Sequence, residues 1–175
     1  MNKIIIRASI FLSIFFFASA SMCNKEEPNS QPEYTSLVGY WKLKGGNSFA
    51  IKDNGEQIIT ATLKEGVFAN EFFADGNMIG HDLTGSLPSE KGTWKLEVQK
   101  LDDKDIEEGT LSIYTDYSKE NAGTLFIDAD GSIKYNIATI NNPSQGGKPH
   151  MYLTTKRYEV YPYKENWVYY IYEKQ

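Results

Sequence analysis

The side chains that could carry out catalysis are few in this chain of 175 residues. It contains two histidines, His81 and His150, and one cysteine, Cys23. A catalytic zinc site typically takes three protein ligands, and no spacing marks a carboxylate that would complete a two-histidine site. The stretch "TGSLPSE" contains serine but lacks the Gly-x-Ser-x-Gly pattern of a nucleophile on a sharp turn. We therefore expect a protein that is not an enzyme and that has neither a metal site nor a cofactor.

The acidic stretch "LDDKDIEEG", residues 101–109, is the other candidate for chemistry, because carboxylates are ligands that Ca²⁺ prefers. An EF-hand loop also has a glycine at its sixth position and a terminal glutamate, and this stretch lacks both. A solvated acidic loop is the favoured interpretation, with loose calcium binding as the alternative.

Cys23 occupies a position that suggests lipid attachment. Residues 1–22 contain Lys3 and Arg7, followed by the apolar run "ASIFLSIFFFASA". This run of about 13 residues matches a signal-peptide core and is too short to span a membrane, which takes roughly 20. Cys23 comes just past it and resembles the lipobox cysteine of bacterial lipoproteins, which becomes the acylated first residue. The resemblance implies anchoring to a membrane through the N-terminal lipid.

Met22 departs from the lipobox pattern, in which a small residue precedes the cysteine. Cleavage after Ala20 is the alternative, and it would leave Cys23 as a free thiol in a secreted or periplasmic protein. The "NKEE" that follows Cys23 resembles the signal that sends some lipoproteins of Gram-negative bacteria to the cell surface. We expect an outer-membrane lipoprotein, with surface exposure and a solvated linker as the two interpretations of "NKEE".

The mature chain is acidic and has the length of one domain. Removal of residues 1–22 leaves 16 basic and 23 acidic residues, a net charge of −7, which disfavours binding to nucleic acid or to anionic lipid surfaces. Residues 23–36 contain two prolines and no apolar periodicity, which predicts a flexible tether. Residues 37–175 are long enough to bury a core without disulfides.

Apolar residues of this domain recur with period two, which predicts many short antiparallel strands. In "TWKLEV", for example, Trp94 and Leu96 face one side and Lys95 the other. Turn sequences such as "KDNGE", "FADGN" and "DADGS" separate the runs. The expected strands are 38–44, 47–52, 56–63, 67–74, 78–83, 92–99, 109–115, 122–129, 132–140, 150–161 and 167–173. We predict an all-β fold, an antiparallel up-and-down meander barrel of about 8–10 strands without a long helix, with a β-sandwich as the alternative.

The order of several short motifs resembles that of bacterial lipoproteins with a lipocalin-like domain. The motifs are "LVGYWKL", "EFFADGN", "KGTWKL", "GTLSI", "YNIATI" and "MYLTTKRY". The resemblance implies a small barrel over residues 37–175, in which Gly39 and Trp41 form the barrel floor. It also implies an arginine over the floor tryptophan, but Arg157 lies about forty residues beyond the "TDY" of Thr115–Tyr117, too far for the usual spacing. A short variant without the long helix fits these departures.

The phrase Gly-x-Trp-Lys-Leu occurs twice, at Gly39 and at Gly92. We expect both copies to begin core strands of one barrel, with an internal duplication as the alternative. A barrel of about eight strands leaves room for side chains or for one small molecule. The first functional hypothesis is therefore a small apolar ligand in the lumen, contacted by Trp94, Ile113, Phe126, Tyr135, Ile137, Tyr158 and Tyr170.

The second functional hypothesis is a filled barrel that acts as a cell-surface interaction module. It rests on the aromatic stretch "HMYLTTKRYEVYPYKENWVYY", residues 150–170, in which only one face of each strand can be core. The opposite face is either covered by neighbouring side chains or exposed as a platform for a protein or a glycan. Binding through the rim or through this tyrosine-rich face is the alternative to a lumen ligand.

Overall fold

The structure is a computed structural model that describes residues 36–102, 105–124, 126–140 and 147–175. The predicted signal peptide, Cys23 and all of the predicted tether except Ser36 lie outside these residues. The described elements are β1 (Gly39–Ile51), β2 (Gln57–Leu63), β3 (Phe68–Phe72), β4 (Asn77–Asp82), β5 (Glu90–Asp102), β6 (Asp105–Thr115), α2 (Asp116–Glu120), β7 (Ile133–Ile140), β8 (His150–Thr155), β9 (Tyr158–Val160) and β10 (Tyr163–Lys174). Within the described ranges, no helix is long and apolar enough to cross a membrane.

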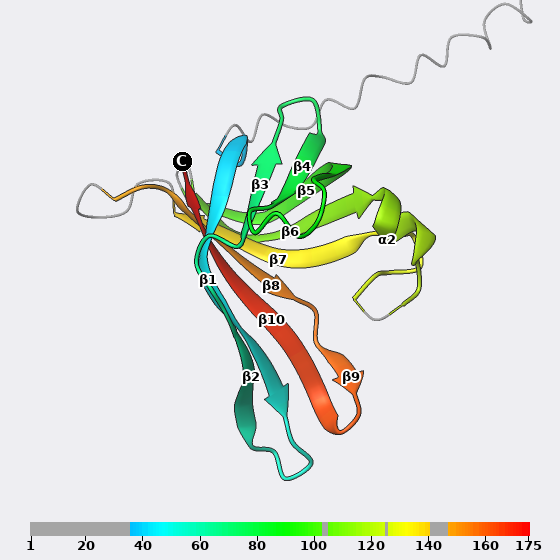
Figure 1. Cartoon of the computed structure of the whole chain (residues 1–175). Coiled ribbons are helices and arrows are strands. Elements are labelled where there is room, and N and C mark those ends of the chain that lie inside the picture. Colours follow the sequence, from blue (N-terminus) through cyan, green and yellow to red (C-terminus); the bar gives the residue numbers. More distant parts are fainter. Residues whose placement is uncertain (1–35, 103–104, 125, 141–146) are drawn as a thin grey trace, which may run out of the picture. The chain divides into compact units, whose positions relative to one another are not determined.

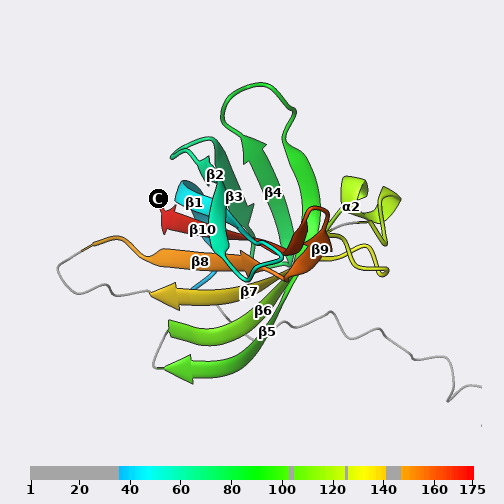
Figure 2. The ribbon, with the colours of Figure 1, turned by 90° about the horizontal axis from the view of Figure 1, so that it is seen from below.

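Eight of the strands close into an antiparallel barrel (Figure 1, Figure 2). Around the ring they follow the order β1, β3, β4, β5, β6, β7, β8 and β10, and β10 pairs with β1 to close it. This confirms the predicted all-β, up-and-down barrel and excludes the sandwich. Closure pairs the edges that an open meander would leave exposed.

β1 and β10 are longer than the barrel needs, and their distal halves form a second structure that we call the arm. The arm consists of β2, residues 46–51 of β1, residues 163–169 of β10, and β9. Figure 1 shows it projecting away from the barrel. A bulge between Leu43 and Gly45 marks its beginning, and a Cβ at Gly46 would collide with the carbonyl of Tyr169. The strands predicted at 38–44 and 47–52 are thus one bent strand.

Period-two alternation places one face of every barrel strand in the interior. The interior residues form one apolar cluster, whose buried members include Leu43, Phe72, Met78, Leu96, Ile106, Leu111, Ile137, Met151 and Leu153. Thr139 is buried among them and accepts a hydrogen bond from the Ile106 amide at 2.9 Å. The core is therefore continuous around the ring.

Both tryptophans of the repeated phrase are buried at one end of the barrel, which we call the closed end. The Trp41 indole donates to the Leu37 carbonyl at 2.7 Å, and the Trp94 indole donates to the Phe73 carbonyl at 3.1 Å. Trp94 also packs edge-on against Phe72, with ring centroids 5.7 Å apart. Each buried N–H has a partner, so both rings can fill the core without leaving a donor unpaired.

A cation covers Trp41, and it comes from the last strand. The Lys174 Nζ lies 5.4 Å from the centroid of the Trp41 ring and donates to the Ser36 carbonyl at 3.1 Å. Burial lowers the pKa of Lys174. Arg157 is elsewhere: its guanidinium lies 4.6 Å from the centroid of Trp167 on the arm and pairs with Glu165 at 2.7 Å.

The strand predicted at 122–129 is wrong. The chain instead forms the short helix α2 and a series of turns before β7. Thr115 caps the helix: its hydroxyl accepts from the Ser118 amide at 3.1 Å, and the Ser118 hydroxyl accepts from the Thr115 amide at 2.8 Å. This capping box starts the helix at the end of a strand, and it gives Thr115 of the "TDY" motif a local structural role.

Candidate functional site

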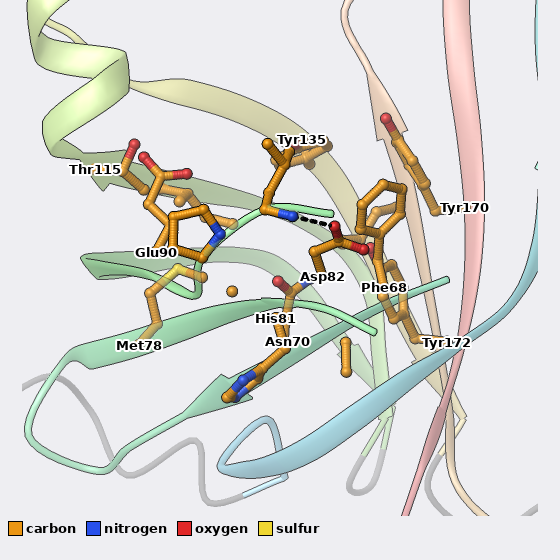
Figure 3. Close-up of a pocket in the computed structure, with 16 residues that line it drawn as sticks. Phe68, Asn70, Met78, His81, Asp82, Glu90, Thr115, Tyr135, Tyr170 and Tyr172 are labelled. Carbon is orange, nitrogen blue, oxygen red and sulfur yellow. Dashed lines mark hydrogen bonds between the residues drawn. The ribbon is translucent and has the colours of Figure 1, made fainter. Parts of the chain in front are cut away.

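The half of the lumen away from the two tryptophans contains a cavity of 270 Å³ (Figure 3). Strands β3, β4, β5, β6, β7, β8 and β10 all contribute to its lining. The side chains that define it are Phe68, Asn70, Met78, Asp82, Glu90, Ile113, Thr115, Tyr135, Leu153, Tyr170 and Tyr172. The lumen is therefore filled at the closed end and hollow at the other, which we call the open end.

Strand register explains why these residues meet. Asn70 pairs with Gly80, Phe72 with Met78, and Tyr172 with Leu43, so each pair shares the interior face. Gly80 contributes no side chain, and a Cβ built on it would have its nearest neighbours at 3.7–4.0 Å. The cavity therefore exists in part because a glycine stands where the alternation calls for an inward side chain.

Three tyrosines form one wall of the cavity. Tyr135 and Tyr170 meet edge to face with ring centroids 6.1 Å apart, and Tyr172 lies 6.3 Å from Tyr170. Burial raises the pKa of all three hydroxyl groups, so they stay protonated at neutral pH and can donate hydrogen bonds.

The three hydroxyl groups differ in their partners. The Tyr172 hydroxyl is hydrogen-bonded to Asn70. Among the described residues, the structure gives no hydrogen bond to the hydroxyl of Tyr135 or Tyr170. These two groups are the polar features of the wall that a bound molecule could satisfy.

Asp82 organises the rim of the cavity. Its carboxylate accepts hydrogen bonds from the Thr84 hydroxyl at 2.7 Å, from the Thr84 amide at 2.8 Å and from the Leu87 amide at 2.8 Å, the last drawn in Figure 3. These bonds lower the pKa of Asp82, so it is ionised at neutral pH. They fold the connection between β4 and β5 and place the exposed Leu87 in the cavity lining, to which Phe68 also contributes.

A second carboxylate holds the connection between α2 and β7 against β8. The Asp128 carboxylate lies 2.9 Å from the Nζ of both Lys134 and Lys156, and hydrogen bonds from these two lysines lower its pKa. Next to this cluster, the rings of Phe126 and Tyr158 meet edge to face at 4.8 Å. The connection at the open end is thus braced by ion pairs.

The predicted lumen residues divide into three groups. Ile113, Tyr135 and Tyr170 line the cavity. Trp94 and Ile137 face the interior but belong to the packed core, outside the cavity lining. Phe126 and Tyr158 contact each other at the open end and do not line the cavity. Gly39 and Trp41 lie at the closed end, and Trp41 is fully buried.

Sequence reasoning missed the contributions of β3 and β4. Phe68, Asn70, Met78 and Gly80 all line the cavity and belong to the hairpin around "FADGN". The alternation in "NMIGHD" was a usable signal, because Met78, Gly80 and Asp82 share one face. The alternation was not recognised because its middle inward position is a glycine, which is not counted as an apolar residue.

The remaining candidates for chemistry lie apart from one another. His81 stands beside Tyr40, with ring centroids 5.6 Å apart, and His150 stands beside Tyr152. The described residues of the acidic stretch belong to the end of β5 and the start of β6, where Glu107 pairs with Lys100. Among the described residues there is no group of three or more His, Cys, Asp or Glu side chains placed to hold a metal ion.

Comparison of the chain with models of protein families, with curated proteins and with solved structures finds no match. The geometry therefore defines the class of protein by itself: a closed antiparallel barrel with a cavity at one end of its lumen.

Proposed function

We propose that this protein is a lipocalin-like, non-enzymatic binding protein that holds one small, mainly apolar molecule in its lumen. The observation that carries the proposal is the 270 Å³ cavity at the open end of an otherwise packed barrel. Its lining combines aromatic rings and aliphatic side chains with a few polar groups, the composition typical of small-molecule sites. This composition favours a binder over a catalyst.

The size and chemistry of the cavity restrict the ligand. An apolar protein cavity of about 150 Å³ is known to bind benzene, so 270 Å³ suits a molecule of one or two rings. The hydroxyl groups of Tyr135 and Tyr170, which have no hydrogen-bond partner among the described residues, favour a molecule that carries one hydrogen-bonding group. Asp82 and Glu90 at the rim are carboxylates, so they disfavour an anion. The ligand class is therefore a small neutral aromatic or alicyclic molecule.

The direct test fills the cavity. Gly80→Leu places a side chain in the lumen at a position where a Cβ has ordinary contacts, so the barrel should still fold. Binding of 2-naphthol, followed by its fluorescence, should be saturable for the natural protein and at least about tenfold weaker for Gly80→Leu, a difference of about 1.4 kcal/mol.

Ala61→Leu serves as the matched control, because Ala61 is an exposed residue of β2 and lies outside the cavity lining. It should bind 2-naphthol as the natural protein does. Equal binding by Gly80→Leu, or no saturable binding by the natural protein, would contradict the lumen proposal and leave the surface-module hypothesis.

We also propose that Cys23 carries a lipid that anchors the barrel to the outer membrane, with the secreted or periplasmic form as the alternative. Cys23→Ala should move the protein from the membrane fraction to the soluble fraction. Mass spectrometry of the mature N-terminus provides the independent check. A chain that begins at Ser21 with an unmodified thiol would contradict lipidation.

A further inference from the structure

The outer face of the barrel carries a second concavity, which we call the outer groove. It has a volume of 660 Å³ and lies over β5, β6, β7, β8 and β10. Interior and exterior positions alternate along each strand, so its outward side chains are distinct from those that line the lumen cavity. The lining of the groove shares no residue with the cavity at the open end.

A row of hydroxyl and amide side chains runs across the floor of the outer groove. Thr110 pairs with Asn136, Asn136 with Thr154, and Thr154 with Tyr169. Directly paired residues of an antiparallel sheet point to the same face, so the four side chains stand side by side. The row therefore presents several hydrogen-bonding groups on one surface.

Two tyrosines form the aromatic side of the groove. The rings of Tyr152 and Tyr169 are nearly parallel, with planes 15° apart and centroids 6.2 Å apart. His150 continues the series, with its ring 6.4 Å from that of Tyr152 and 23° from parallel. Both tyrosines are only half-buried. Each ring thus keeps apolar surface accessible next to the polar row.

The opposite side of the groove is polar and acidic. Gln99, Glu107 and Glu108 from the hairpin of β5 and β6 line it, and all three side chains are exposed. The Gln99 amide donates to the Thr110 hydroxyl at 3.3 Å, which links this side to the polar row. Glu107 is paired with Lys100. Glu108 adds a carboxylate acceptor at the same edge.

We propose that the outer groove binds a neutral oligosaccharide. A sugar ring has an apolar face of C–H bonds that packs on an aromatic ring, and hydroxyl groups at its edge that need donors and acceptors. The groove provides aromatic rings on one side and amide, hydroxyl and carboxylate groups on its floor and opposite side. This site is independent of the proposed lumen ligand.

Other ligand classes fit the outer groove less well. The residues of the polar row are paired with a neighbouring strand on both sides, so a peptide finds no free backbone edge on the floor of the groove for strand addition. The carboxylates of Glu107 and Glu108 disfavour an anion. The polar row would leave its hydrogen-bonding groups unsatisfied against a wholly apolar ligand. A polyhydroxy ligand without charge satisfies all three conditions.

The test measures binding of cellohexaose, xylohexaose, chitohexaose and maltohexaose to the natural protein by calorimetry. At least one should bind saturably, and Tyr152→Ala and Tyr169→Ala should each weaken it about tenfold or more. Tyr161→Ala, which removes a tyrosine that is 98% exposed outside the groove, is the matched control and should bind as the natural protein does.

Two further variants keep the result interpretable. Asn136→Ala truncates an exposed groove residue without touching the core, so it should fold normally and bind more weakly. Gly80→Leu fills the lumen and should leave saccharide binding unchanged, which separates this proposal from the lumen proposal. Failure of all four saccharides to bind, undiminished binding by both tyrosine variants, or binding of a cationic peptide in place of the saccharides would each overturn the saccharide site.

Discussion

The two halves of the barrel interior are built from the same strands but differ in how completely they are filled. At the closed end, Trp41, Trp94 and Phe72 occupy the space, and both indole N–H groups donate to carbonyls. At the open end, the tyrosine wall and Gly80 leave 270 Å³ free. The same alternation of inward and outward residues can therefore produce a packed core or a cavity. Which of the two forms depends on the volume of the inward side chains at that height along the barrel axis and on their hydrogen-bond partners.

The largest effect on stability should come from removing a buried tryptophan at the closed end. Trp41→Ala removes a fully buried indole and its hydrogen bond, so the free energy of unfolding should fall by about 3–5 kcal/mol. For a domain of this size, the melting temperature should drop by roughly 10 °C or more. Calorimetry measures the change. Binding of 2-naphthol by the folded fraction should be unaltered, and a large loss of affinity would contradict the separation of the two ends.

A pair of glycine substitutions compares a crowded position with an open position of the barrel. A Cβ at Gly92 would collide with the carbonyl of Tyr114, whereas a Cβ at Gly80 has only ordinary contacts. Gly92→Ala should therefore destabilise the protein by about 1–3 kcal/mol. Gly80→Ala should be neutral or stabilise it by about 0.5 kcal/mol, because it restricts the unfolded chain. Urea midpoints for both variants test this, and equal midpoints would refute the difference in packing.

Removal of single hydroxyl groups probes the tyrosine wall. Tyr172→Phe breaks the bond to Asn70 and should cost about 1 kcal/mol of stability. Tyr170→Phe breaks no hydrogen bond among the described residues, so its melting temperature should match that of the natural protein. Its affinity for 2-naphthol should nevertheless fall several-fold if the Tyr170 hydroxyl binds the probe. Unchanged affinity in both variants would exclude the wall from ligand recognition.

The smallest effect on stability should come from the Asp128 carboxylate, and it should depend on pH. The lowered pKa of Asp128 means that its contribution to stability is complete above the ordinary aspartate value of about 3.9 and is lost as the pH falls through the lowered value. Asp128→Asn should therefore cost up to about 1 kcal/mol at neutral pH and nothing near pH 2. Unfolding curves at pH 7, 4 and 2 measure this, and a pH-independent cost would rule out the ion pairs as its source.

Much of the fold could be predicted from sequence because alternation reports directly which face of a strand is buried. The failure at 122–129 has a local cause. Three consecutive apolar residues, 125–127, favour a strand there, but Gly123 and Phe126 have positive φ, and the Thr124 hydroxyl donates to the Asn121 carbonyl at 2.7 Å. Side-chain bonds of this kind stabilise turns against a strand, and hydrophobic periodicity does not detect them.

The candidate cavity was predictable only in part. Alternation identifies Ile113, Tyr135 and Ile137 as inward-facing, but it does not say how high along the barrel axis each one lies. That height depends on the stagger between strands and on bulges, such as those between Val98 and Leu101. Ile113 and Tyr135 thus reach the cavity, while Ile137 lies in the packed core.

The seam between β1 and β10 also determines the order in which the barrel can assemble. It joins the first and last strands, and Trp41 and Lys174 are partners although roughly 130 residues separate them in sequence. During synthesis, the hairpins from β3 to β8 can form early. β1 can pair with β10 only after the last strand has left the ribosome. We expect closure to be the slow step of folding, since long-range pairing raises the contact order. Hydrogen exchange during refolding should then protect the amides of β5 and β6 before those of β1.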